Sequence, residues 1–231
     1  MSTKNPHRMN LWKSDMARIT ENYCNHFQTV GIESPDATMN RSEEEHQAHF
    51  KGLLSHLSLK GDVSILDIGC GKGSLIPFIH DYFPQVSLSS YLGIDLVSEF
   101  LGYARRVFPQ YRFELSDFLA QDFSDACFDC VIALGVLVMR THDYETFVEA
   151  FIRKMCRVSS RYVLFNVISE INETTAASVH SKEIGFPTVF PLDRLEKILQ
   201  SIASIRYEIK SEAIFGDSTD SFVTIWKKNS Y

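Results

Sequence analysis

The chain has no surplus of positive charge. Its 231 residues include 23 lysines and arginines against 29 aspartates and glutamates, which gives a formal net charge of −6 at pH 7. Proteins that hold nucleic acids mainly through their phosphates need clustered basic side chains. The composition therefore predicts a small-molecule partner and no nucleic acid.

Long apolar runs are missing as well. No uninterrupted apolar stretch approaches the roughly 20 residues that cross a bilayer. The first ten residues, MSTKNPHRMN, are polar and lack the apolar core of a secretory signal. These features predict a cytoplasmic protein without a membrane partner.

Cysteines are few, and their number is odd. Five cysteines are spread along the chain, which does not suggest a disulfide framework. Cys127 and Cys130 form a C-x-x-C pair, but a zinc site needs four ligands and no second pair exists, so they are interpreted as thiols flanking a strand start. His46 and His49 stand one helical turn apart and are interpreted as part of a solvated helix face. We expect no metal.

The first 60 residues differ in character from the rest. They are polar and poor in β-branched runs, and Ser42 is a plausible cap for a helix that places Phe50, Leu53 and Leu57 on one side. This pattern predicts an N-terminal helical cap segment, residues 1–60, followed by a second unit over 61–231.

From residue 61 onward, short apolar runs alternate with amphipathic stretches, which indicates an α/β fold with a mainly parallel sheet. Two final runs joined by the turn-rich GDSTD predict a C-terminal antiparallel hairpin. The expected strands cover 63–68, 90–95, 111–116, 129–135 and 161–168, and the expected helices 74–83, 97–107, 143–157 and 191–203.

Glycine is scarce, with eleven in the chain, yet three fall within five positions of the stretch ILDIGCGKGS. A glycine-rich turn between a strand and a helix lets bare backbone amides approach a nucleotide-like ligand. The dinucleotide fingerprint requires Gly or Ala where Ser74 stands, and its third glycine would not come as early as Gly73. NAD is therefore the weaker interpretation. Lys72, within the loop, is interpreted as a solvated charge.

Four stretches in order resemble the class I S-adenosylmethionine-dependent methyltransferases. They are LDIGCGKGS, YLGIDL, LSDF and FDCVIALGVL. The resemblance implies a Rossmann-like, mainly parallel seven-stranded sheet flanked by helices, and S-adenosyl-L-methionine as cofactor. The cofactor-binding residues that it implies are Asp67, Gly69, Gly71, Gly73, Asp95, Leu96, Asp117, Phe118 and Leu134.

Each acid has a chemical reason to be there. A carboxylate at a strand end accepts hydrogen bonds from both ribose hydroxyls, the role that the resemblance implies for Asp95. A carboxylate beside adenine accepts from its exocyclic amine, which is the role implied for Asp117. Asp67 could hold the glycine loop through backbone amides or face the ammonium group of the ligand.

The acceptor is expected at the carboxyl ends of the strands, between the loop at 135–142, the loop NVISEINETT after the fifth strand, and the N-terminal helices. Tyr23 and Phe27 would then lie near the cofactor. Methyl transfer mainly needs alignment of donor and acceptor, so a base is optional. His142 is the candidate base because its ordinary pKa lies near neutrality.

The sequence thus predicts a methyltransferase that acts on oxygen or nitrogen of a small-molecule acceptor. The family's N-P-P-Y-like tetrad is absent where ALGVLV stands, which counts against methylation of DNA bases or protein glutamine. Two other classes stay open: a non-catalytic protein that binds S-adenosylmethionine as a regulatory or interaction module, and an NAD-binding oxidoreductase. The acceptor and the oligomeric state are open too.

Overall fold

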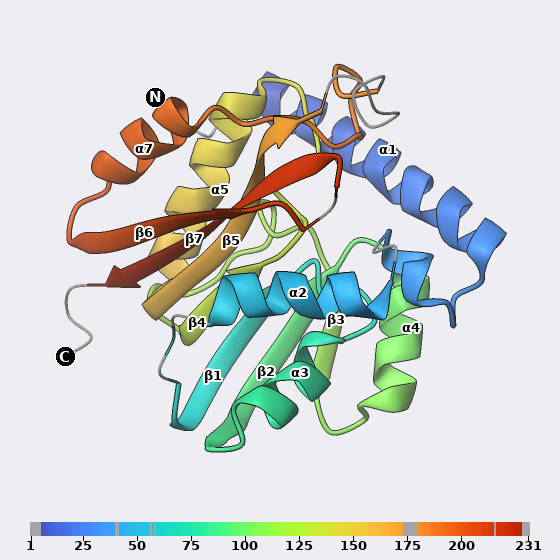
Figure 1. Ribbon diagram of the computed structural model, residues 1–231, viewed down its shortest axis with the longest axis vertical. Coiled ribbons are helices and arrows are strands. Elements are labelled where there is room, and N and C mark those ends of the chain that lie inside the picture. Colours follow the sequence, from blue (N-terminus) through green and yellow to red (C-terminus); the bar gives the residue numbers. More distant parts are fainter. Residues whose placement is uncertain are drawn as a thin grey trace.

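The computed structural model describes residues 6–39, 42–55, 57, 59–172, 180–214 and 216–227. Its centre is a seven-stranded sheet (Figure 1). The strands are β1 (Gly61–Ile68), β2 (Val86–Asp95), β3 (Arg112–Leu115), β4 (Phe128–Ala133), β5 (Ser159–Ile171), β6 (Ile205–Glu212) and β7 (Ser218–Lys227).

The strand order across the sheet is β3-β2-β1-β4-β5-β7-β6. The first five strands run parallel, whereas β7 lies antiparallel to both β5 and β6. The N-terminal end of β7 therefore meets the carboxyl ends of β1 to β5 at one edge. The order reverses between β1 and β4, and in open α/β sheets such a switch point is where ligands bind.

Helices cover both faces of the sheet (Figure 1). α5 and α7 pack on one face, and α2, α3 and α4 on the other, each burying an apolar side against the strands. The helices are α1 (Pro6–Val30), η1 (Pro35–Thr38, a 3-10 turn), α2 (Glu43–Leu54), α3 (Leu75–Tyr82), α4 (Ser98–Val107), α5 (Tyr144–Val158) and α7 (Leu192–Gln200).

α1 crosses the carboxyl edge of the sheet and is anchored to it at one end (Figure 1). Trp12 is buried in the main core, where its ring meets Phe147 of α5 edge-on at 5.5 Å. Its indole N–H donates to the carbonyl of His142, in the loop after β4, at 2.9 Å. The N-terminal helix is thus packed into the core.

The α/β class, the seven-stranded sheet and the C-terminal hairpin that the sequence predicts are confirmed. One expected loop is wrong. β5 continues to Ile171, so Asn166 and the residues after it are strand, because they pair with β7 up to Ser218. The end of the expected loop, 173–175, lies outside the described residues. Within the described ranges, no helix is long and apolar enough to span a membrane.

Candidate functional site

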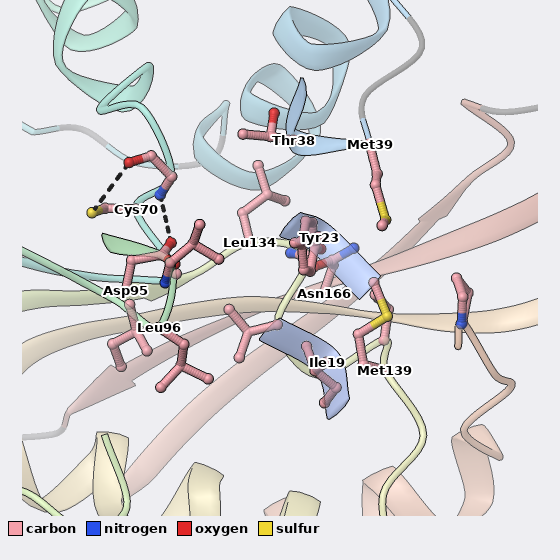
Figure 2. A pocket seen from close by; sticks show the side chains of 18 of the residues that line it. Ile19, Tyr23, Thr38, Met39, Cys70, Asp95, Leu96, Leu134, Met139 and Asn166 are labelled. Carbon is pink, nitrogen blue, oxygen red and sulfur yellow. Dashed lines mark hydrogen bonds between the residues drawn. The ribbon is translucent and has the colours of Figure 1, made fainter. Parts of the chain in front are cut away.

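A cavity of about 310 Å³ opens at the carboxyl edge of the sheet (Figure 2). The ends of β1, β2 and β5, the segments after β3 and β4, and the beginning of β7 form its floor. α1, η1 and α2 border it as well, together with side chains of α4 and α5. Every residue that the sequence predicts to bind cofactor lines this cavity except Gly73.

The glycine loop has the backbone conformation that requires glycine. Gly69 and Gly71 have φ angles of 71° and 53°, and a Cβ on Gly69 would stand 2.5 Å from a methyl of Val136. Gly73, with φ 82°, packs instead against the rings of Phe108 and Phe113. Two of the three glycines therefore face the cavity, and the third lets the loop sit close to its neighbours.

Asp95, at the end of β2, holds the glycine loop in place (Figure 2). Its Oδ2 accepts from the Gly71 amide at 2.8 Å, and its Oδ1 accepts from the Val97 amide at 2.8 Å. Burial raises the pKa of this carboxyl, and these amide donors oppose the rise. Since each carboxylate oxygen has two lone pairs, both can still accept a bond from a ligand.

Asp67, at the end of β1, has a different environment. Its Oδ2 accepts from the Tyr91 hydroxyl at 2.6 Å, and the side chain is buried. Burial raises its pKa to about 7, against the effect of the Tyr91 hydrogen bond. The sequence leaves two roles open for Asp67, and one of them is to hold the glycine loop through a backbone amide. In the structure, Asp95 accepts from the Gly71 amide of that loop.

Asp117 and Phe118 follow β3 and line the same end of the cavity. Asp117 Oδ1 accepts from the Leu119 amide at 2.9 Å, which fixes the carboxylate on the turn. Phe118 packs on Phe151 of α5 with ring centroids 4.8 Å apart. A carboxylate beside an aromatic ring suits a planar base that carries an amine.

Lys72 is not the solvated loop charge that the sequence suggests. Its side chain is nearly buried, and its ammonium donates to the carbonyls of Ile32 and Ser34 at 3.1 and 2.7 Å. It also lies 5.1 Å from the ring centre of Tyr103. The glycine loop is thereby tied to the segment between α1 and η1, which the sequence pattern could not show.

The far side of the cavity is apolar. Ile19 of α1 packs with Met139 and Ile168, and Tyr23 borders this cluster (Figure 2). Tyr23 lines the cavity as expected, whereas Phe27 packs one layer away against Phe100. Two compartments result: a polar one at the glycine loop and an apolar one under α1.

His142, the expected base, lies beside this cavity and not among the residues that line it. Its Nδ1 is 2.7 Å from Oδ1 of the buried Asp15 on α1, and its backbone amide donates to Oδ2 at 2.8 Å. The imidazole is half exposed. These contacts tie α1 to the loop after β4.

The expected solvated helix face at His46 and His49 is wrong. Both residues line the cavity, and His49 is 4% exposed, because α2 turns this face toward the sheet. His49 Nε2 lies 3.5 Å from Oδ2 of Asp220 on β7. Asn166 of β5 donates to the other oxygen of Asp220 at 2.7 Å. Within the described ranges, no three His, Cys, Asp or Glu side chains gather as metal ligands would.

Sequence reasoning missed Asp220 and the role of Asn166. The stretch GDSTD reads as a turn, and the structure places its last residue in β7, facing the cavity. A period-two pattern, with Asp220, Phe222 and Thr224 alternating along the strand, was the available signal. An acid on the buried face of a strand is rarely there without a partner.

The polar compartment lies in a part of the chain that is similar to known proteins. Residues 65–159, from the middle of β1 to the start of β5, match a family described as a methyltransferase domain. This part of the chain is similar to a methyltransferase domain, and its fold is shared with solved methyltransferases that contain S-adenosylhomocysteine. The matched stretch contains the glycine loop, the acids at the ends of β1 and β2, and the acid after β3.

Two curated relatives have methyltransferase names. The chain is 26% identical over 157 residues to a putative methyltransferase, 235L, of Invertebrate iridescent virus 6, covering 66% of the chain and 57% of the relative. It is 31% identical over 101 residues to trans-aconitate 2-methyltransferase of Variovorax paradoxus, covering 44% and 38%. The matches thus span less than two thirds of either relative.

Solved structures share the fold of this chain. Magnesium protoporphyrin IX methyltransferase from Synechocystis, with bound S-adenosylhomocysteine (SAH), superposes with a TM-score of 0.62 at 18% identity, covering 92% of this chain and 99% of that one. Geranyl diphosphate C-methyltransferase from Streptomyces coelicolor, also with SAH, gives 0.66 at 10% identity, covering 93% and 98%. At such identities the likeness shows the fold alone.

Proposed function

We propose that this protein transfers the methyl group of S-adenosylmethionine to oxygen or nitrogen of a small-molecule acceptor. The observation that carries the proposal is one continuous cavity with two compartments. Its polar compartment has the glycine loop, Asp95 and Asp117, and its apolar compartment lies under α1. A volume near 310 Å³ is at the lower end of the range for small-molecule sites.

In the polar compartment, Asp95 accepts hydrogen bonds from the ribose hydroxyls and Asp117 accepts from the adenine amine. Leu96, Phe118 and Leu134 border the adenosine. Bound there, S-adenosylmethionine supplies an activated methyl group. The protein's part is to align the acceptor with that methyl and to exclude water, which the cover formed by α1 and η1 favours. The solved relatives crystallised with SAH support this assignment.

The charge of the cavity favours a neutral or cationic acceptor. Five aspartates and one lysine line it, and the lysine, Lys72, is already bonded to two carbonyls. Among the described residues that line the cavity, carboxylates outnumber cations, which disfavours a tricarboxylate such as the acceptor in the name of the Variovorax relative. We therefore propose a different acceptor for this chain.

Calorimetric titration with S-adenosylmethionine, SAH and NAD tests the cofactor. Binding of the first two and no binding of NAD is expected; the reverse would favour an oxidoreductase. A screen of small-molecule acceptors, followed by detection of SAH, tests turnover. Tight cofactor binding without turnover on any acceptor would favour the non-catalytic regulatory module instead.

A further inference from the structure

A histidine and an aspartate face each other inside the cavity, where no role has been assigned to them. His49 comes from α2 and Asp220 from β7, and their side chains are 6% and 3% exposed. Nε2 of His49 is 3.5 Å from Oδ2 of Asp220, and both residues line the cavity. Two buried ionisable groups thus meet on a surface that a ligand can reach.

The surrounding contacts fix the orientation of both groups. Nδ1 of His49 lies 3.0 Å from the carbonyl of Glu45, and since a carbonyl only accepts, Nδ1 carries a proton. Nε2 is therefore the atom of the neutral ring that can take up a proton. Asp220 Oδ1 accepts from the Asn166 amide, whose own Oδ1 accepts from the Gly135 amide at 2.7 Å.

This chain of contacts leads from the pair to the cofactor side of the cavity. Gly135 lies in the segment after β4, between Leu134 and Val136. This segment is close to the glycine loop, since a Cβ on Gly69 would touch the side chain of Val136. Figure 2 shows Asn166 between Leu134 and the apolar side chains of Met39 and Met139. The pair therefore stands where the two compartments meet.

Asp220 Oδ2 is the unusual atom. It is buried and accepts no hydrogen bond from the described residues. At 3.5 Å, the His49 Nε2 lies beyond the usual N–H···O distance. A buried carboxylate oxygen without a donor is costly, so an O–H or N–H group is needed to complete the site.

We propose that His49 accepts the proton of the methyl acceptor, that Asp220 binds the group that carries it, and that this acceptor has a hydroxyl or amine on an apolar body. The inference rests on the proposed function and names the acceptor class of the same cavity. The apolar body would lie against Ile19, Met139 and Ile168, with its donor group between Nε2 and Oδ2. His49 is the catalytic residue, and Asp220 binds the donor and faces the imidazolium.

The proton and the electrons balance without another reactant. A lone pair of the acceptor oxygen or nitrogen forms the bond to the methyl carbon. The carbon–sulfur bond of the sulfonium breaks, and its electron pair stays on sulfur, which leaves SAH. The O–H or N–H proton moves to His49 Nε2, and the imidazolium later releases it to water.

The other charged groups near the pair do not take over this role. His46, one turn earlier on α2, packs on Phe50, and burial lowers its pKa to about 4, which makes it a weak proton acceptor. Lys72 is bonded to the carbonyls of Ile32 and Ser34. The competing explanation is structural, namely that the pair only fastens α2 to β7.

Binding of three matched probes to the SAH-saturated full chain separates the two explanations. para-Ethylphenol has a hydroxyl, para-ethylaniline has an amine, and para-ethylanisole has the same body with a methyl ether in place of the donor. We expect the phenol or the aniline to bind roughly tenfold or more tightly than the anisole, the scale of a hydrogen bond to a charged group. Which of the two binds better distinguishes a hydroxyl from an amine acceptor.

The variants His49→Gln and Asp220→Asn should each reduce this preference at least severalfold, whereas His46→Gln, on the same helix and in the same cavity, should keep it. Thermal unfolding and SAH affinity verify that each variant is folded. In nuclear magnetic resonance spectra of the chain with isotope-labelled histidine, the favoured probe should shift the His49 Nε2 signal and leave that of His142 in place.

Equal affinity for all three probes, or an unmoved His49 signal, would overturn the inference and leave a structural pair. The proposed function fails separately, through an absence of SAH binding in the first titration or of turnover in the acceptor screen. Should either variant fail to fold, the probe preference and the His49 signal of the unmodified chain still decide.

Discussion

Asp67 and Asp95 end neighbouring parallel strands, yet their surroundings differ. Asp95 accepts from two backbone amides, which stabilise its charged form, while Asp67 accepts from the Tyr91 hydroxyl in a buried site. An acid with amide donors suits the neutral hydroxyls of a ribose, since it stays ready to accept. A buried acid with a raised pKa responds to the charge placed beside it.

Replacing Asp95 by Ala should weaken SAH binding by roughly 1.5 to 3 kcal/mol, because the ribose loses a charged acceptor. Titration calorimetry measures the change. Asp95→Asn, which keeps one carbonyl oxygen for the Gly71 amide, is the matched control and should lose less. Unchanged affinity in a folded Asp95→Ala protein would remove Asp95 from the ribose site.

Asp67 should make the stability of the free protein depend on pH. Its pKa is raised from 3.8 to about 7, so between these values the folded chain holds a proton that the unfolded chain releases. The free energy of unfolding therefore falls as pH rises through that window. Compared with Asp67→Asn, the unmodified chain should lose roughly 2 to 3 kcal/mol between pH 5 and pH 8.

Urea unfolding of both proteins at the two pH values measures this difference. Contributions to the stability from groups that titrate in both proteins cancel in the comparison. Parallel stability curves for the two proteins would contradict the raised pKa of Asp67. Addition of SAH, whose ammonium group would favour the ionised carboxylate, should reduce the dependence if Asp67 faces that group.

His142 stays a prediction as a base, and its contacts suggest a test at the same scale. His142→Ala removes the ring contact of the buried Asp15 and keeps its contact with the backbone amide, which should cost about 1 to 3 kcal/mol of stability. Chemical unfolding measures this cost. Once an acceptor is known, the rate of each variant can be measured against pH. If His142→Ala loses the pH dependence and His49→Gln keeps it, His142 is favoured over His49 as the base.

At the scale of elements, the walls of the cavity come from segments far apart in the chain. α1 and η1 lie over the carboxyl edge, and the Lys72 ammonium fastens the loop between them to the glycine loop. The glycine loop, which precedes α3, is thus connected through Lys72 to the segment that covers the cavity. Movement of the 31–38 segment and order in the glycine loop should therefore change together.

Lys72→Met should loosen this connection while keeping the apolar stem of the side chain. Hydrogen exchange is expected to speed up in residues 31–38 and in the glycine loop, and to stay unchanged in β4 and β5. Lys60→Met, at an exposed position before β1, is the control and should change neither. Equal exchange in the two variants would mean that the Lys72 contacts do not hold the segment.

The sequence predicts the helices and strands well, but it predicts the tertiary contacts between them poorly. The glycine loop and Asp95 were recognisable because each belongs to a short local pattern. His49 resembled a solvated position because its neighbours at 43–45 are acidic, and Asp220 resembled a turn residue. Their contact depends on β7 entering the sheet beside β5, a tertiary pairing that local patterns do not encode.

For the molecule as a whole, ligand binding should appear as stability. SAH at 100 times its Kd adds about 2.7 kcal/mol to the free energy of unfolding, which for a chain of this size raises Tm by roughly 5 to 10 °C. A thermal-shift titration measures it, with NAD at the same concentration as the control. A Tm that stays constant with SAH would contradict the cofactor assignment.

The place of β7 has a consequence for how the protein is made. β7 follows β6 in sequence and is the last strand that the structure describes, but it lies between β5 and β6 and brings Asp220 to His49 of α2. During synthesis the glycine-loop half can assemble first, while β5 presents an open edge that is prone to aggregation. A newly made chain could thus hold its cofactor before it can recognise a substrate, and saturating cofactor should favour productive folding over aggregation on the ribosome.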